Sequence, residues 1–231
     1  MKHRNSHLLV GYWSRIRAGR DVPDQTDVDP RAIKRMLSQL FILESTDPAR
    51  ASFRLAGTWL CDRFGFELRG TSFLGTWEAQ SRSPLVSLLR QSLLAKQPVC
   101  VSSIGSSADN MMVEMETVLA PLSFGGAGPT RFMGMVQLVG DSAAFAGRPI
   151  AFQRLVGSKI VSEDEPIANL PPPPSIPPAD FGRGHPRAPH LRLVVSRDKP
   201  AMVHFEMDEL MQTLISALEI KREPPLSLLR R

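Results

Sequence analysis

The spacing of hydrophobic and polar residues predicts three helices in the first hundred positions. Apolar side chains recur at helical spacing over residues 6–19, and Gly19 is a plausible end of that helix. Pro30 favours the start of a second, short helix. A stripe of leucines over residues 84–97 predicts the clearest helix of the chain.

Strand-like patterns fill much of the remaining chain. Apolar and polar residues alternate, or β-branched and aromatic residues gather, between turn signals such as Asp47-Pro48 and a glycine-rich loop. The order is two strands, short helical pieces, one long helix and then three strands, which argues for an α+β fold with an antiparallel sheet. The five predicted strands are 40–46, 52–57, 98–105, 111–122 and 131–140.

Glu114 and Glu116 are the pair of carboxylates that we weigh for acid–base chemistry. They lie two residues apart in one predicted strand, on the face opposite Val113 and Met115. We therefore expect both carboxylates to face solvent, and the chain has no other catalytic spacing. The sequence predicts a protein that is not an enzyme.

The character of the chain changes after residue 140. A polyproline run makes residues 141–204 a predicted Pro-rich linker, and residues 205–231 form a predicted tail that begins with an amphipathic helix over 205–220. Residues 1–37 form a predicted N-terminal helical arm, which leaves 38–140 as the folded domain. We expect the C-terminal part to be largely disordered apart from its helix.

Two apolar stripes are the natural association surfaces. The stripe of the 205–220 helix favours docking on its own domain or on another copy of the chain. The predicted interaction residues are Tyr12, Trp13, Ile16, Leu210, Leu214 and Leu218.

Charge and cysteine content narrow the class of protein. The formal net charge is +5, and residues 1–37 hold eight Lys/Arg against four Asp/Glu. A nucleic-acid-associated regulator that uses this basic arm remains an alternative, but residues 38–140 have no net charge, which favours a protein partner. Two cysteines, Cys61 and Cys100, make no disulfide framework or zinc site, and no apolar run is long enough to span a membrane. We expect a cytoplasmic protein.

Short sequence motifs within this order of elements resemble those of the PAS superfamily. FGFELRGTSFLGTW at 64–77 resembles the PAS pattern of an aromatic-glycine pair, Glu-Leu-x-Gly and an apolar-aromatic segment. LAGT at 55–58 and the leading YWSRIRAGRDVPDQTDVDP at 12–30 resemble bacterial PAS-like proteins with a single domain behind an N-terminal helical arm. The resemblance covers roughly residues 8–140.

This resemblance implies a fold and a class of function. The implied fold is a five-stranded antiparallel sheet in the order 2-1-5-4-3, with helices on one face that enclose a small pocket. The implied function is sensory or regulatory: a bacterial signalling protein that contacts a partner, associates as a homodimer and is gated by a small apolar ligand. A ligand-free docking or dimerisation module is the alternative.

The stretch FRLAGTWLCDRFGFELRGTSF at 53–73 and the tryptophan that follows supply the candidate pocket. Two interpretations stay open, because these side chains can line a ligand cavity or simply fill the core. An arginine in the stretch could anchor an anionic group. The residues are Trp59, Cys61, Arg63, Phe64, Phe66, Phe73 and Trp77.

Cofactor chemistry has little support in the predicted domain. All five histidines lie outside 38–140, which disfavours haem. Cys61 stands in Trp-Leu-Cys-Asp-Arg-Phe and lacks the Asn-Cys-Arg-Phe-Leu-Gln run that the resemblance would require for flavin photochemistry. No histidine near Cys61 would activate its thiol, so we predict a pocket-wall or core cysteine, no cofactor and no metal.

Overall fold

The computed structural model describes residues 1–140, 145 and 147–161. The predicted tail with its 205–220 helix, and the predicted linker beyond residue 161, lie outside these described residues. Within them, the expected order of elements is present. The structure adds the short turn η1 (Gln25–Asp27) in the N-terminal segment and a sixth strand after the five expected ones.

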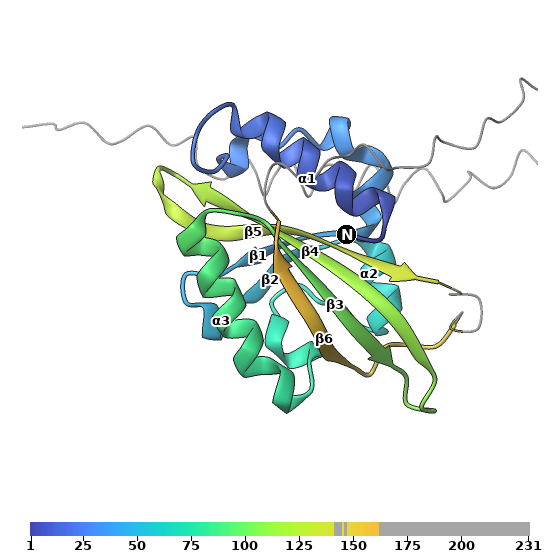
Figure 1. The fold of residues 1–231 in the computed structure, drawn as a ribbon. Coiled ribbons are helices and arrows are strands. Elements are labelled where there is room, and N and C mark those ends of the chain that lie inside the picture. The colour runs from blue at the N-terminus through green and yellow to red at the C-terminus, as the bar shows by residue number, and fades with distance from the viewer. Residues whose placement is uncertain (141–144, 146, 162–231) are drawn as a thin grey trace, which may run out of the picture.

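A six-stranded antiparallel sheet forms the centre of the domain (Figure 1). The strand order is β2-β1-β5-β4-β3-β6, so the predicted order 2-1-5-4-3 is confirmed for the first five. Each of these five overlaps its predicted range. The strands are β1 (Leu40–Glu44), β2 (Ser52–Ala56), β3 (Val99–Ser106), β4 (Met112–Phe124), β5 (Ala127–Val139) and β6 (Phe152–Ile160).

The sixth strand corrects the predicted domain boundary, because it lies in the segment expected to be linker. β6 pairs with β3 from Ser106↔Phe152 to Val99↔Ile160. The pairing shifts between Ser102 and Ser103, so Val156 is an extra residue in the strand. This bulge interrupts the period of two, which hides the strand from a search for alternation.

Three helical elements pack on one face of the sheet. They are α2 (Thr58–Phe64), the 3-10 turn η4 (Phe73–Thr76) and α3 (Ala79–Ala95), and a further short turn, η3 (Pro48–Arg50), joins β1 to β2. Side chains of α2, η4 and α3 form one buried cluster with those of the strands. Figure 1 shows α3 on this side of the sheet.

The helices within 38–140 therefore lie on one face, as expected, and the N-terminal segment packs on the opposite face. It consists of α1 (Arg4–Arg17), η1 (Gln25–Asp27) and η2 (Pro30–Gln39). Figure 1 shows α1 lying across the sheet opposite α3. These elements share a second buried cluster with side chains of β1, β4 and β5. The arm is therefore a layer of the domain.

Candidate functional site

Aromatic rings fill the layer between the sheet and α2, η4 and α3, where the predicted pocket was expected. Phe73 contacts three other rings: its ring centroid is 6.2 Å from that of Phe41, 5.8 Å from that of Phe53 and 5.9 Å from that of Trp77. Most of these are edge-to-face contacts, the arrangement that aromatic pairs prefer. Phe41 also requires the glycine at 134, because a Cβ there would overlap its ring.

The seven predicted pocket residues differ widely in burial. Phe64, Phe73 and Trp77 belong to the buried cluster, with exposed fractions of 5%, 2% and 1%. Trp59 and Cys61 are half-buried at its margin, and Phe66 is 49% exposed. The contacts between rings favour the core-filling interpretation for the buried residues.

The outer side of α2 carries the two polar members of the predicted set. The guanidinium carbon of Arg63 lies 5.3 Å from the centre of the Trp59 ring, a cation–π contact, so this arginine points away from the core. The Cys61 thiol lies 3.7 Å from Oε1 of Glu67. Burial, followed by the neighbouring carboxylates of Glu67 and Asp62, raises the pKa of Cys61, so a smaller fraction of this thiol is thiolate at neutral pH than in an ordinary cysteine.

Four polar atoms inside the aromatic layer lack hydrogen-bond partners in the described residues. They are Nε1 of Trp77, Oγ of Ser103, Oγ1 of Thr117 and Oε1 of Gln153, and all four residues are at most 2% exposed. The Nε2 of Gln153 donates to Oγ1 of Thr76 at 3.2 Å, so only one end of that amide is satisfied. Buried polar atoms normally have partners, and such a group can mark the place of a water or ligand.

Glu116 corrects the expectation that both carboxylates of β4 face solvent. It is 2% exposed, and its oxygens accept the backbone N–H groups of Lys2 at 2.5 Å and His3 at 3.1 Å. Burial by itself would raise the pKa of Glu116, but the Ser6 hydroxyl and these N–H groups outweigh it and hold the pKa below its ordinary value. The carboxylate therefore fastens the beginning of α1 to the sheet, while Glu114 pairs with Lys2 at the surface.

Cys100 lies on the same face of the sheet as Glu116. It is 4% exposed, and burial, together with the charge of Glu116, raises the pKa of its thiol to about 12. This agrees with the predicted core role. Cys61 and Cys100 belong to the two clusters on opposite faces of the sheet, and both are free.

Tyr12 and Trp13, expected to form an association surface, are instead buried in the second cluster. Their exposed fractions are 5% and 1%, and Ile16 is partly buried beside them. Nε1 of Trp13 donates to the carbonyl oxygen of Pro121 at 2.7 Å, and the Tyr12 hydroxyl accepts the backbone N–H of Asp29 at 2.7 Å. The apolar side of α1 faces its own sheet because that sheet leaves Met133 and Met135 to be covered.

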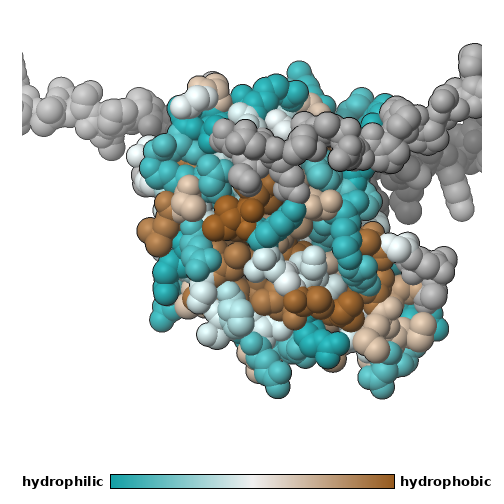
Figure 2. Space-filling view, in the orientation of Figure 1, coloured by the Kyte–Doolittle hydropathy of each residue, from teal (hydrophilic) through white to brown (hydrophobic). Residues whose placement is uncertain are grey.

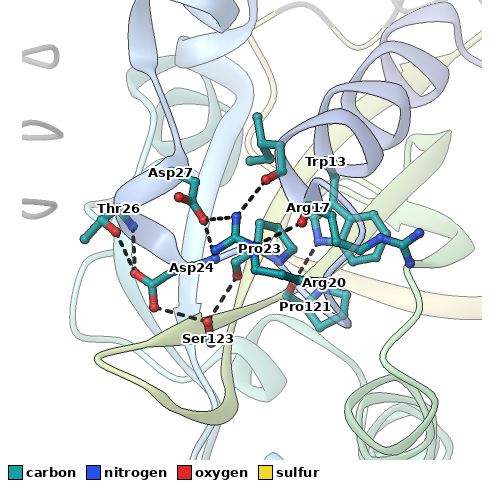
Figure 3. A network of polar contacts seen from close by, with 10 residues as sticks. Trp13, Arg17, Arg20, Pro23, Asp24, Thr26, Asp27, Pro121 and Ser123 are labelled. Carbon is teal, nitrogen blue, oxygen red and sulfur yellow. Dashed lines mark hydrogen bonds and ion pairs between the residues drawn. The ribbon is translucent and has the colours of Figure 1, made fainter.

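A polar network fastens the segment after α1 to the end of β4 (Figure 3). The backbone N–H of Ser123 donates to the carbonyl oxygen of Pro23 at 3.0 Å, and its hydroxyl lies 3.1 Å from Oδ2 of Asp24. Asp24 and Asp27 form a capping box around η1, and Arg20 pairs with Oδ2 of Asp27 at 2.7 Å. The arm is thus fixed at both ends, at Glu116 and at Ser123.

Four of the eight large apolar side chains that are exposed in the described residues lie along β6 and at the nearby end of β4. Phe152, Val156 and Ile160 are 42%, 64% and 44% exposed, and Met112 is 66% exposed. Figure 2 shows hydrophobic side chains in the middle of the face along which β6 runs in Figure 1. One side of β6 pairs with β3. On the other side, the carbonyl oxygen of Gln153 accepts the backbone N–H of Glu78 at 2.9 Å and the N–H of Leu155 donates to the Ser81 hydroxyl at 2.9 Å, so the open edge of the sheet begins at Val156. An edge strand with apolar side chains is a typical surface for pairing with another chain.

Neither a metal centre nor a membrane span is found in the described part of the chain. Residues 1–140, 145 and 147–161 contain no group of three or more His, Cys, Asp or Glu side chains that could hold a metal ion. No helix among these residues is long and apolar enough to cross a bilayer.

Several solved structures of light-oxygen-voltage (LOV) domains resemble the chain. A LOV domain studied with a flavin analogue has 15% identity and a TM-score of 0.39, over 50% of this chain and 87% of its own. The LOV protein of Rhodobacter sphaeroides has 15% identity and a TM-score of 0.39, over 51% and 72%. The light state of the Aureochrome1 LOV domain has 13% identity and a TM-score of 0.38, over 50% and 91%.

Sequence comparison with protein families gives the assignment. No curated protein matches the chain. A family described as PAS domain matches residues 1–137, which includes α1, η1 and η2 as well as β1 to β5. The matched region therefore contains both layers of helices and five of the six strands. The chain belongs to this family of PAS domains.

Proposed function

We propose that the chain is a regulatory PAS protein that acts through contacts with other proteins and performs no catalysis. Membership of a PAS family supports a sensory or regulatory role. The observation that carries the proposal is the packing of Phe41, Phe53, Phe73 and Trp77 against one another in the place where a pocket was expected. Because these side chains fill the layer, the protein would transmit a signal through contacts at its surface.

The contact that we propose first is a homodimer formed through β6. An antiparallel pair of identical edge strands about a two-fold axis is self-complementary, because each strand offers the same row of backbone groups. Val156 and Ile160 would bury their exposed surface in such a pair. A signalling protein that offers its own strand could use the same edge.

Gating by a small ligand is the second candidate, and the unpartnered polar atoms favour it. Trp77, Ser103, Thr117 and Gln153 present one indole N–H, two hydroxyls and one amide oxygen without partners inside the aromatic layer. A ligand there would be mainly apolar with a few polar atoms, as is usual for buried small-molecule sites. It would have to displace at least one ring of the cluster.

Two further features are part of the proposal. We propose a cytoplasmic location, because both cysteines are free and lie on opposite faces of the sheet. A bacterial origin is an expectation from the resemblance of residues 12–30.

Native mass spectrometry of the full chain, compared with its denatured mass, separates the two candidates. A native mass equal to the mass of the chain or of its dimer supports the filled core. A small-molecule surplus that is released on denaturation would overturn it in favour of ligand gating.

The contact through β6 is tested by sedimentation velocity of the wild type and the variant Val156→Lys. We expect a concentration-dependent dimer that the variant weakens about tenfold, because a buried lysine at the pairing would lack a partner. A wild type that stays monomeric would contradict the dimer, and Arg154→Lys is the matched control.

A further inference from the structure

A groove of about 620 Å³ lies between α1 and η2, on the outer side of the N-terminal layer. The groove is lined by Arg4, Asn5, His7, Leu8, Gly11, Tyr12, Arg15, Arg31, Ala32, Ile33, Lys34, Arg35 and Met36.

The charge of this groove is one-sided. Five of its lining residues are arginine or lysine, and no aspartate or glutamate lines it. None of the five forms an ion pair within the described part of the chain, although Arg15 lies 5.3 Å from the centre of the Tyr12 ring. All five side chains are exposed. Unpaired cations around one depression create a positive potential that attracts an acidic partner.

The groove also has apolar surface. Leu8 is 44% exposed at its edge and Ala32 is exposed beside it, while the largely buried Ile33 and Met36, 3% and 8% exposed, contribute only small areas from η2. A site that combines apolar walls with cations at the rim suits an amphipathic helix with acidic side chains. A nucleic-acid backbone would use the cations and leave the apolar surface without a partner.

The chain itself contains a segment with these properties. Residues 205–220 carry Glu206, Asp208, Glu209 and Glu219 and no lysine or arginine. Their predicted apolar stripe consists of Met207, Leu210, Met211, Leu214, Ile215 and Leu218. Three of the four acids lie in the first turn of that predicted helix, next to the start of the stripe.

The connection is long enough for this segment to reach the groove. Val161, the last described residue, is 2% exposed and packs in the same cluster as α1 and η2, so the chain leaves the domain on that side of the sheet. The 43 residues 162–204 then separate it from the segment. Even a random coil of 43 residues would have a root-mean-square span of roughly 35 Å, and prolines extend a chain further, whereas α1 is about 21 Å long. A tether of this kind gives a local concentration on the order of millimolar, so a weak contact would be populated.

We propose that the groove between α1 and η2 is the docking site of the chain's own acidic segment 205–220. Asp208 and Glu209 meet Arg31, Lys34 or Arg35, while Leu210 and Leu214 cover the apolar walls. The docking is intramolecular. The segment occupies the basic groove until an acidic partner displaces it. This inference is independent of the contact through β6 and of the content of the aromatic layer.

Zero-length cross-linking of the full chain tests the docking, because a carbodiimide couples a carboxylate only to an amine that touches it. Lys34 is the only lysine among the groove residues, and the surface pair Lys96–Asp21 serves as the internal positive control. We expect cross-links from Lys34 to Glu206, Asp208 or Glu209 in the monomer. The variant Arg31→Glu/Arg35→Glu should reduce their yield about tenfold and leave the Lys96–Asp21 product unchanged. Arg50→Glu/Arg69→Glu, which reverses two exposed charges outside the groove, is the matched control.

The remaining outcomes decide against the proposal. Absence of a Lys34 cross-link, with the control product present, would overturn it. A mixture of isotopically labelled and unlabelled chains that gives mainly mixed products would show that a second copy supplies the segment, and would overturn the intramolecular site. Binding of a 20-nucleotide DNA duplex at low salt, lost in Arg31→Glu/Arg35→Glu and unaffected by Leu210→Glu/Leu214→Glu, would assign the groove to nucleic acid instead.

Discussion

The two faces of the sheet are covered in different ways. On one face, α2, η4 and α3 enclose a cluster in which Phe73 touches three other rings. On the other, α1 and η2 cover mainly aliphatic and methionine side chains. That second layer is also fastened by directional hydrogen bonds, from Trp13 to Pro121 and from the start of α1 to Glu116.

The two layers are therefore stabilised by different kinds of interaction. The aromatic layer is held by packing, so its stability should depend on ring volume and scarcely on pH. The N-terminal layer is held in part by a few polar contacts at its two ends, so it should respond to the loss of single hydrogen bonds and to pH. A partner can reach the outer surface of the N-terminal layer, whereas the rings of the aromatic layer are mostly buried.

The largest expected effect breaks the aromatic layer. Phe73→Ala removes a ring that contacts Phe41, Phe53 and Trp77, and should lower the free energy of unfolding by about 3–5 kcal/mol. Urea unfolding followed by circular dichroism measures this change. Phe66→Ala, at a ring that is 49% exposed, should cost less than about 1 kcal/mol. Equal losses in the two variants would contradict a layer held by ring packing.

A smaller effect tests the bond that holds α1. Trp13→Phe keeps an aromatic ring in the second cluster but leaves the carbonyl oxygen of Pro121 without its donor, which should cost about 2 kcal/mol. Trp59→Phe is the control, because Trp59 is only half-buried and its indole nitrogen has no acceptor in the described residues. If both variants unfold at the same urea concentration, the hydrogen bond contributes nothing to stability.

The next effect depends on pH. The folded-state pKa of Glu116 lies below its ordinary value, so the stability it contributes is fully present above that ordinary value and is lost as pH falls through the folded-state pKa. Glu116→Gln should cost about 1 kcal/mol at pH 7, and the difference from wild type should shrink toward pH 3. Glu114→Gln, at the exposed carboxylate that pairs with Lys2, is the control. Parallel stability curves for wild type and Glu116→Gln from pH 7 to 3 would refute the role of this carboxylate.

The smallest effect concerns reaction rates and leaves stability unchanged. At pH 8, a thiol reagent should modify Cys61, at the margin of the aromatic layer, at least about a hundredfold faster than Cys100, whose pKa is about 12 and which is 4% exposed. Peptide mapping of the modified protein identifies the order, and Cys61→Ser should leave only the slow reaction. Rapid modification of Cys100 would mean that the N-terminal layer opens readily.

Much of the aromatic layer could be predicted from the sequence, because its signals are local. The leucine stripe of α3, the strand order and the burial of Phe64, Phe73 and Trp77 follow from spacing and from the PAS-like words at 64–77. Residue spacing alone could not show whether the seven candidate residues line one pocket. The direction of a side chain such as Arg63, stacked on Trp59 outside α2, depends on packing that the sequence does not encode locally.

The N-terminal layer was harder to predict, because its contacts join residues far apart in the chain. Glu116 alternates with apolar residues, as an exposed residue would, and becomes buried only because α1 covers that face. Strand β6 escaped detection because the bulge at Val156 interrupts its alternation. The basic groove arises only when folding brings Arg4 and Arg15 beside Arg31 and Lys34.

Hydrogen exchange of the full chain, read by mass spectrometry, tests most directly the claim that the N-terminal segment is a layer of the domain. If it is, the backbone amides of α1 between residues 8 and 17 should exchange as slowly as those of α3, through unfolding of the whole domain. The predicted result is the same protection for both helices at pH 7. Fast exchange throughout α1 while α3 stays protected would show an arm that detaches from the sheet, and would contradict the account.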